Sequence, residues 1–507
     1  MRVFPIVLLL SLVAVGAHPS PAGAQSPLLR IGIGSDPDVL DPTLSRSVAG
    51  RQVFASLCDK LIDIDADLHF VPQLATAWTW SADGFALSLT LRPGVRFHDD
   101  TPMDAEAVRG ALQRHLTMQG STRKAELGPI ASIETTGPLA LTIHLSAPFA
   151  PLVAALADRA GMMVAPRAAT QTGAEFAASP SCAGPYKLVR RIAQDRIDLE
   201  RFPAYWDAGA VAFDRITYQP VPDSTIRVAG LRAGGLDLIE QISPSDLAGL
   251  RADKRVKVLS GPSLASVYIA VNVANGPRSK SPIGQNPLIR QALDDSIDRD
   301  VLNKVAFEGA YTPGNQSVAP GRPFYASRYP VPPRRLERAR DVLQQVGPGR
   351  VHMQMSVPNN TEYLQSSEII QSMAAEAGID IQLVQTEVAT LLQQWTDGNF
   401  ETLIVAWSGR VDIDGNLYNF NACGAALNGG HYCNPDLDRL LTQGRSSTDM
   451  VTRQAIYANA AGVYLNDRPY IYLWHSALII GASEKLEGLQ LIPDGLIRPK
   501  GLHLRQG

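Results

Sequence analysis

A strand–helix–strand pattern in the second half of the chain places the strongest constraint on its fold. Residues 352–357 and 379–384 are predicted strands, and the apolar stripe of residues 361–377 between them predicts a helix that ends at Gly378. Strands joined through such a helix pair in parallel. The continuous apolar run at residues 402–407 is typical of a buried central strand of the same sheet. This part of the chain is therefore predicted to be an α/β unit.

The first half shows the same alternation of predicted strands and helices. Residues 28–34 and 87–91 have strand patterns, and residues 104–115 form an amphipathic helix with Asp104 as its N-cap. Turn residues Gly261, Pro262 and Ser263 then introduce another strand, which we take as a crossing into a second lobe.

The length of the chain requires more than one core. About 480 residues follow the N-terminal leader, and single cores stop growing at roughly 250–300 residues. We expect a signal peptide, residues 1–24, followed by two lobes, with the chain passing from one lobe to the other twice. Lobe I is expected to comprise residues 25–265 and 476–507, with an inserted subdomain at about 63–178, and lobe II residues 266–475. Two crossings between α/β lobes predict a hinged clamp with a ligand in its cleft.

The N-terminus predicts export. Arg2 precedes an apolar run at residues 3–15, and small residues Ala22 and Ala24 flank Gly23 before an expected cut at Gln25. The apolar run is shorter than the roughly 20 residues that span a bilayer, although a membrane anchor is the alternative interpretation. Because no cysteine lies near the cut, we expect no lipid anchor and a free protein in the periplasm.

Composition and motifs exclude several classes of function. The net charge of −3 implies no strongly basic face for nucleic acid. The sequence has no Gly-x-Ser-x-Gly elbow, no His-Glu-x-x-His and no Walker loop, so we expect neither an enzyme nor a cofactor or metal.

Four cysteines fit an oxidising compartment. Cys423 and Cys433 flank a loop rich in Gly, Ala and Asn, and a disulfide between them would restrain this flexible loop. This interpretation favours Cys423–Cys433, with Cys58–Cys182 by elimination. Four cysteines allow three connectivities, and buried reduced thiols are the alternative.

Several motifs spread over most of the chain identify a family. They include Trp78-x-x-Ser81-x-Asp83-Gly84, Leu91-Arg92-x-Gly94-Val95-x-Phe97-His98-Asp99, Ala183-Gly184-Pro185-Tyr186, Tyr205-Trp206, Ile289-Arg290-Gln291-Ala292-Leu293 and Tyr432-x-Asn434-Pro435. In this order they resemble the peptide/nickel family of ABC-importer substrate-binding proteins. The usual His-Asp-Gly is His98-Asp99-Asp100 here. We expect these residues to be structural, with His98 either satisfied by hydrogen bonds or at the surface.

The resemblance implies a fold and a role. The fold is the two-lobed periplasmic-binding-protein clamp of type II, in its large subclass with an extra N-terminal subdomain, hinged by crossover strands. The expected partners are a small-molecule or peptide ligand and the permease subunits of an ABC transporter at the inner membrane, and the protein is expected to be a monomer. Glutathione, an opine, a nickel chelate or haem are alternative ligands, and a periplasmic chaperone or sensor partner is an alternative role.

The loop after residues 402–407 is the main candidate for ligand binding. Peptide-binding relatives carry there an Asp, three residues after the Trp, that binds the peptide amine, whereas this chain has Arg410 at that position. An arginine favours a carboxylate or phosphate. The neighbouring candidates of this loop are Trp407, Ser408, Gly409, Asp412 and Asp414. Either Arg410 and Asp412 together hold a zwitterion, or the ligand is not a simple dipeptide, or the two side chains pair with each other.

Other candidates lie at strand ends. Dipeptide-binding relatives place an arginine for the ligand carboxylate after the strand at 352–357, where this chain has Asn359 and Asn360. The remaining candidates are Ser35 after the first strand and Tyr268 at the predicted crossing. Arginines 46 and 51 are expected to be solvated or to pair locally, and Trp474 and His475 to serve the hinge or core.

Overall fold

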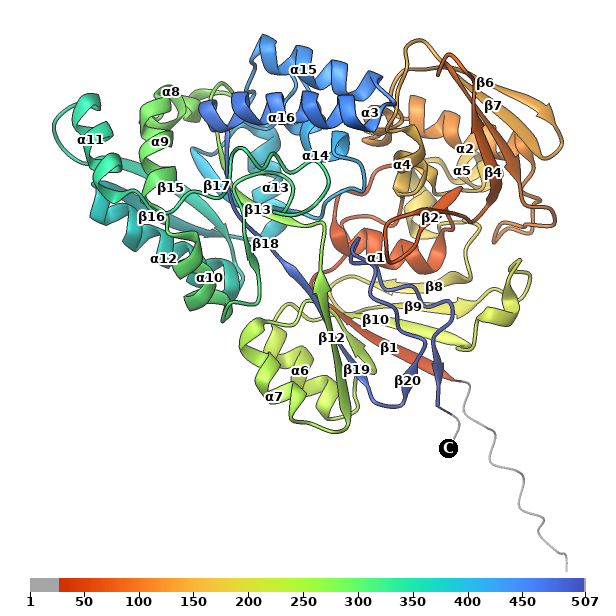
Figure 1. Cartoon of the computed structure of the whole chain (residues 1–507). Coiled ribbons are helices and arrows are strands. Elements are labelled where there is room, and N and C mark those ends of the chain that lie inside the picture. The colour runs from red at the N-terminus through yellow and green to blue at the C-terminus, as the bar shows by residue number, and fades with distance from the viewer. Residues whose placement is uncertain (1–26, 506–507) are drawn as a thin grey trace, which may run out of the picture.

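The computed structural model describes residues 27–505 (Figure 1). The predicted signal peptide, residues 1–24, lies outside the described residues. Within residues 27–505, none of the helices has both the length and the apolar character needed to cross a bilayer.

The second half of the chain forms a six-stranded mixed sheet. Its strands lie in the order β14 (Thr312–Pro313), β18 (Tyr470–His475), β13 (Ser266–Val271), β17 (Thr402–Trp407), β15 (Val351–Pro358) and β16 (Ile379–Thr386). β15 pairs in parallel with both β16 and β17, and β13 lies antiparallel to β17 and β18. The predicted parallel pairing and the central place of residues 402–407 are confirmed.

Both faces of this sheet are buried, because alternate side chains of its strands enter two separate cores. In β13, Ile269 belongs to one hydrophobic cluster and Tyr268 to the other. The first core receives α8 (Pro282–Gln285), α9 (Pro287–Ser296), α10 (Arg299–Phe307), α11 (Leu336–Val346) and α12 (Thr361–Ala377). The second core receives α13 (Val388–Asp397), α14 (Asp414–Asn421), α15 (Pro435–Ser446) and α16 (Met450–Asp467).

Local sequence sets the limits of α12 as predicted. The Asn360 side chain accepts a hydrogen bond from the backbone N–H of Glu362 at 2.9 Å, which caps the first turn. Gly378 ends the helix with a φ of 108°, a conformation that favours glycine.

The first part of the chain and its C-terminal part share a seven-stranded sheet. Its order is β12 (Val256–Pro262), β19 (Ala477–Ser483), β11 (Leu238–Ile239), β1 (Leu28–Ile33), β10 (Arg215–Pro220), β9 (Arg196–Arg201) and β8 (Tyr186–Ile192). β1 is central and pairs in parallel with β10 and β11. The same lobe contains the helices α1 (Val48–Leu57), α6 (Ser224–Arg232) and α7 (Leu247–Arg251). It also contains the antiparallel strand pair β20 (Leu486–Glu487) and β21 (His503–Leu504).

An antiparallel four-stranded sheet lies between α1 and β8 in the chain. Its order is β4 (Ala75–Trp80), β5 (Ala86–Leu91), β7 (Ala140–Leu145) and β6 (Ile130–Gly137). The same stretch contains β2 (Ile62–Ile64), β3 (Phe70–Pro72), α2 (Ala105–Thr117), α3 (Arg123–Leu127), α4 (Leu152–Leu156) and α5 (Pro166–Thr172). This sheet lies at the far right in Figure 1, beside the seven-stranded sheet, and both contribute to one core.

Two short connections join the large sheets. Three residues separate β12 from β13, and the single residue Ser476 separates β18 from β19. The connections also contact each other, because the Ser263 hydroxyl donates a hydrogen bond to the Ser476 carbonyl. His475 Nδ1 lies 3.2 Å from the Ala265 carbonyl oxygen. The molecule is thus an α/β clamp of two lobes, joined by two adjacent connecting segments at the hinge (Figure 1).

Both predicted disulfides are present. Cys58–Cys182 joins the end of α1 to the segment just before β8, and so closes the base of the stretch that carries the four-stranded sheet. Cys423–Cys433 closes the predicted loop.

Two of the motifs, those around His98 and Gly184, meet at the base of this stretch and are structural. His98 Nδ1 accepts a hydrogen bond from Cys182 N–H at 3.2 Å, and its Nε2 lies 3.1 Å from the Gly184 carbonyl. Both ring nitrogens of a neutral imidazole are thereby satisfied, which confirms the expectation for His98. A Cβ at Gly184 would lie 2.4 Å from the Leu57 carbonyl, so only glycine fits there.

Asp100 has a φ of 62° at the position where the motif that the sequence resembles has glycine. A non-glycine residue in this left-handed region carries a steric cost. We expect Asp100→Gly to raise the free energy of unfolding by about 0.5–1 kcal/mol, measured by urea denaturation. Asp100→Ala is the matched control and should lower it, and a destabilised Asp100→Gly variant would contradict the assignment.

Buried His115 predicts a loss of stability in acid. Its Nδ1 lies 2.9 Å from Thr43 Oγ1 and its Nε2 3.1 Å from the Met162 carbonyl, so the ring is satisfied when neutral. Burial, together with nearby Arg123 and Arg114, lowers the pKa of His115 to about 4. An unfolded histidine takes up a proton near pH 6.5, so the unfolded state binds more protons between pH 6.5 and 4 and stability falls as the pH decreases through this window.

Replacing this histidine should weaken the pH dependence. We expect His115→Gln to reduce the slope of the unfolding free energy against pH between pH 6.5 and 4, as measured by urea denaturation. The reduction should correspond to at most one fewer proton taken up on unfolding. His69→Gln, at an exposed histidine, is the control and should leave the slope unchanged. An unchanged slope in His115→Gln would contradict a neutral buried ring.

Candidate functional site

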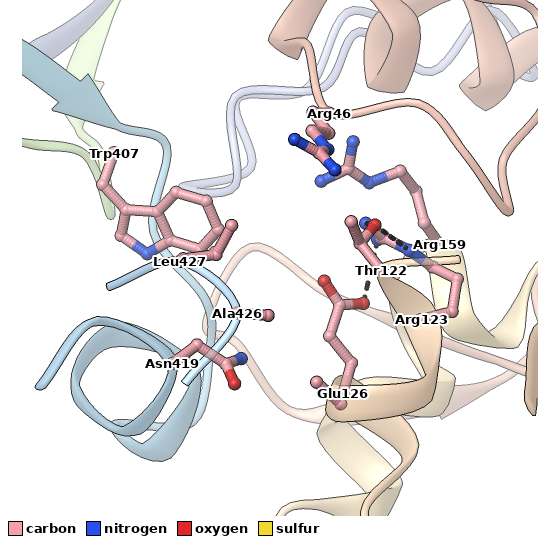
Figure 2. A pocket seen from close by; sticks show the side chains of 10 residues that line it. Arg46, Thr122, Arg123, Glu126, Arg159, Trp407, Asn419, Ala426 and Leu427 are labelled. Atoms are coloured by element: carbon pink, nitrogen blue, oxygen red, sulfur yellow. Dashed lines mark hydrogen bonds and ion pairs between the residues drawn. The ribbon is translucent and has the colours of Figure 1, made fainter. Parts of the chain in front are cut away.

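The two lobes meet at a hollow to which both contribute side chains (Figure 2). The first lobe supplies Arg46, Arg159 and parts of residues 122–126, and the second supplies Trp407, Asn419 and the loop residues Ala426 and Leu427. The cavity between them has a volume of about 30 Å³. Figure 2 shows Trp407 and Asn419 on one side of this space and the arginines with Glu126 on the other.

A buried ion pair joins the lobes beside the hollow. The Asp158 carboxylate accepts hydrogen bonds from Arg51 at 3.0 and 3.1 Å, and Arg410 Nε of the second lobe lies 2.9 Å from the same carboxylate. Although burial raises it, the guanidinium groups of Arg410 and Arg51 hold the pKa of Asp158 well below its usual range. The pair is therefore charged, and it holds the lobes together.

The loop after β17 places Arg410 for this contact. Gly409 has a φ of 76°, and a Cβ there would lie 2.2 Å from the Leu264 carbonyl oxygen. The Asn416 side chain accepts a hydrogen bond from Arg410 N–H at 2.7 Å and donates one to the Arg410 carbonyl at 2.9 Å. The Arg410 guanidinium carbon lies 4.2 Å from the centre of the Trp407 ring.

The predicted loop residues divide into two groups. Residues 407–410 lie together at the junction of the lobes, where Ser408 also accepts a hydrogen bond from Arg51 at 3.3 Å. Asp412 and Asp414 are held within the second lobe, by Arg453 at 2.7 Å and by Arg445 at 2.9 Å. The alternative in which Arg410 and Asp412 pair with each other is wrong, since each has a closer partner.

The other predicted candidates lie apart from this group. Asn360 caps α12, Asn359 is exposed beside it, and Ser35 is exposed after β1. Tyr268 is buried in the second-lobe core, with its ring centre 5.2 Å from that of Tyr470. Trp474 is buried against Phe307, in agreement with a core role. Among the described residues, the hollow is not lined by any of these side chains.

The first-lobe wall was missed in the sequence. No local sequence pattern marked its residues as functional: Arg123, Glu126, Asp158 and Arg159. Arg51 was expected to be solvated or to pair locally, but it is 3% exposed and pairs with Asp158, 107 residues away. That correction follows from burial, because a buried guanidinium needs a carboxylate partner wherever the fold supplies one.

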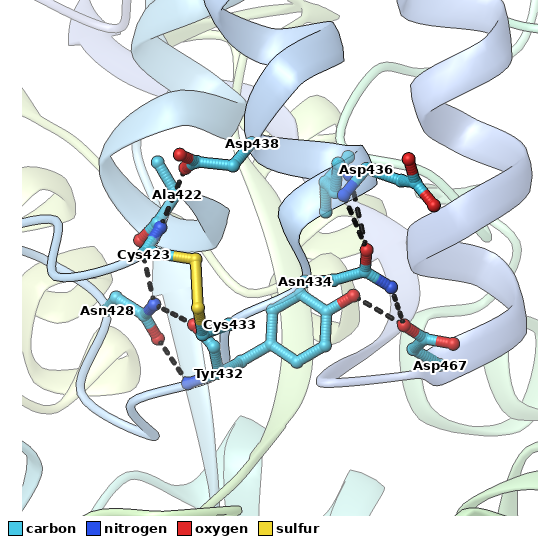
Figure 3. The surroundings of a disulfide bond; sticks show 10 residues. Ala422, Cys423, Asn428, Tyr432, Cys433, Asn434, Asp436, Asp438 and Asp467 are labelled. Atoms are coloured by element: carbon cyan, nitrogen blue, oxygen red, sulfur yellow. Dashed lines mark hydrogen bonds between the residues drawn. A yellow bond between two sulfur atoms is a disulfide. The ribbon is translucent and has the colours of Figure 1, made fainter.

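The disulfide loop supports the second-lobe wall (Figure 3). From within the ring that Cys423–Cys433 closes, Asn428 donates hydrogen bonds to the Tyr432 carbonyl at 2.6 Å and to the Ala422 carbonyl just outside the ring at 3.0 Å. The Tyr432 hydroxyl donates a hydrogen bond to Asp467 at 2.6 Å. These contacts fix the loop that presents Ala426 and Leu427 to the hollow.

Comparison with known proteins places the chain among binding proteins. Residues 69–428 match the model for bacterial extracellular solute-binding proteins, family 5 Middle. The glutathione-binding protein GsiB of Pectobacterium atrosepticum is 29% identical over 92% of each chain. Among solved structures, DppA from Helicobacter pylori in complex with peptide STSA has a TM-score of 0.85 at 22% identity, over 94% of this chain and 98% of that one. The PBP AgaA in complex with agropinic acid from A. tumefacien R10 has a TM-score of 0.84 at 22% identity, over 95% and 99%.

The ion pair across the cleft is testable by a double-mutant cycle. We expect Asp158→Asn and Arg410→Gln to show a coupling of at least about 1 kcal/mol in the free energy of unfolding, measured by urea denaturation. Asp158→Asn combined with Arg439→Gln, at an exposed arginine of α15, is the control cycle and should be additive within about 0.5 kcal/mol. Additivity of Asp158→Asn with Arg410→Gln would contradict a contact between the lobes.

Proposed function

The chain belongs to the bacterial extracellular solute-binding proteins of family 5, and from this premise we propose that it binds a small peptide-like solute in the interlobe hollow. The observation that carries the proposal is the hollow itself, since side chains of both lobes line it. The site therefore changes shape when the lobes move.

We propose that binding works by hinge closure. The lobes divide at residues 263–265 and at Ser476, and the adjacent connections allow one lobe to rotate against the other. Trp407 and the first-lobe arginines contact the solute together only when the lobes are closed. A solute that touches both lobes shifts the population toward the closed form by the free energy of those additional contacts.

The solute class follows from the site and from the relatives. Trp407 offers an aromatic surface for an apolar or planar group, and the arginines opposite favour an acidic group. GsiB is named for glutathione, DppA was solved with a tetrapeptide and AgaA with agropinic acid. Glutathione, a peptide with two carboxylates, is our first candidate.

Delivery to an ABC-transporter permease completes the proposal. We propose that a monomer in the periplasm docks with the membrane subunits in its closed form and releases the solute there. The protein then needs no catalytic residue and no cofactor, because ATP is hydrolysed on other subunits.

Calorimetry on the mature chain, residues 25–507, tests this function. We expect one molecule of reduced glutathione or of a related acidic peptide to bind with a Kd at or below about 10 μM, which corresponds to about 7 kcal/mol. Trp407→Ala should weaken this binding at least tenfold because the aromatic contact is lost, whereas Arg439→Gln should not change it.

Two results would contradict the proposal. One is the absence of binding for glutathione and for a panel of di- to tetrapeptides by a folded protein. The other is an unchanged affinity in Trp407→Ala, which would place the site elsewhere.

A further inference from the structure

We propose that the first-lobe wall of the hollow is an oxyanion subsite, in which Arg159 and Arg46 bind a carboxylate or phosphate group of the solute. The inference rests on the proposed function and specifies the chemistry that this site selects.

The charges around the hollow are unbalanced. Five arginines, which we call the arginine cluster, gather there and at the adjacent ion pair: Arg46, Arg51, Arg123, Arg159 and Arg410. Two carboxylates face them. Asp158 is bound by Arg51 and Arg410, and Glu126 is bound by Arg123 at 2.9 Å, with Arg410 Nη2 at 3.7 Å. The cluster therefore has an excess of three positive charges.

Arg159 is a buried cation without a carboxylate partner in the described part of the chain. Its side chain donates hydrogen bonds to the backbone carbonyls of Ser45 at 2.8 Å and Ser47 at 3.5 Å, and the residue is 2% exposed. Its Nε is buried and has no hydrogen-bond partner among residues 27–505. Neutral carbonyls do not balance a full charge, and burying an unpaired charge is costly. An anion in the hollow would supply the missing partner.

The electrostatic surroundings point the same way. Burial, reinforced by the nearby guanidinium groups of Arg123 and Arg410, holds the pKa of Arg159 well below its usual range. Nearby negative charge would stabilise the charged form, so binding an oxyanion relieves repulsion within the cluster.

Arg46 provides the second, more exposed donor. The Asp38 carboxylate accepts hydrogen bonds from the backbone N–H of Arg46 at 2.7 Å and from the hydroxyls of Ser45 and Ser47 at 2.7 and 2.6 Å. These bonds fix the loop so that the Arg46 side chain lines the hollow (Figure 2). Within the described residues, this side chain makes no ion pair, so its guanidinium fork is available to a solute.

The carboxylates nearby are already occupied. Asp412 and Asp414 bind Arg453 and Arg445 in the second lobe, and Glu126 binds Arg123. A cationic solute would have to displace an arginine from one of them, whereas an anionic one finds Arg159 and Arg46 unpaired. The site should therefore prefer solutes in which acidic groups outnumber amines.

Thermal unfolding of the mature protein with simple anions tests the subsite. We expect malonate or inorganic phosphate to raise the Tm saturably above that in chloride at equal ionic strength. Malonate acting alone would identify a carboxylate subsite, and phosphate acting alone a phosphate subsite. Arg159→Met and the exposed-site variant Arg46→Gln should each reduce the shift at least twofold. Arg109→Gln, at a partly exposed arginine of α2 that pairs with Glu106, should retain the full shift.

Two results would overturn the subsite: an equal Tm in all salts, or a rise in Tm with malonate or phosphate that is unchanged in both Arg159→Met and Arg46→Gln.

Calorimetry separates a failure of the subsite from a failure of the proposed function. We expect glutathione amide, in which the glycine carboxylate is neutral, to bind at least tenfold more weakly than glutathione, and the difference to shrink in Arg46→Gln. Equal affinity of both, unaffected by Arg46→Gln, would overturn the subsite and leave the peptide-binding function standing. Anion shifts without any peptide binding would support the subsite and overturn the peptide proposal.

Discussion

The carboxylate of Asp158 makes the buried contact that joins the two lobes of this protein. It lies in the first lobe, is buried, and binds the guanidinium groups of Arg51 from the same lobe and Arg410 from the other. Breaking a buried pair by removing one partner typically costs about 3–5 kcal/mol, because a buried charge is left uncompensated. Arg410 is thus bound in the contact between the lobes, and we propose the arginines of the opposite wall as those that bind a solute.

The fold supplies the rigidity that such a contact requires. Helices cover both faces of the six-stranded sheet, which stiffens the second lobe. In the first lobe, the disulfide Cys58–Cys182 fixes the base of the stretch that carries Asp158 and Arg159. In the proposed hinge closure, motion is concentrated at the short connections, residues 263–265 and Ser476, and a solute acts at the junction of the lobes.

The sequence predicted well what is determined locally. The helix at 361–377 followed from its apolar stripe, with Gly378 at its end, and the buried strand at 402–407 from its apolar run. The motif residues near His98 and Gly184 identified the family because close packing restricts them. Arg410 was predicted to bind the ligand, and the structure shows it in the ion pair that joins the lobes. Its partner could not be predicted, because Asp158 lies about 250 positions earlier in the chain and only the tertiary fold brings the two together. The same holds for Arg159, whose missing partner is visible only when every contact around it is known.

A crystal structure of the mature protein grown with reduced glutathione tests the central claim most directly. We expect closed lobes, the Asp158–Arg410 pair intact, the solute against Trp407, and a solute carboxylate within hydrogen-bond distance of Arg159 or Arg46. A solute bound outside the hollow, or one whose carboxylates face neither arginine, would contradict it.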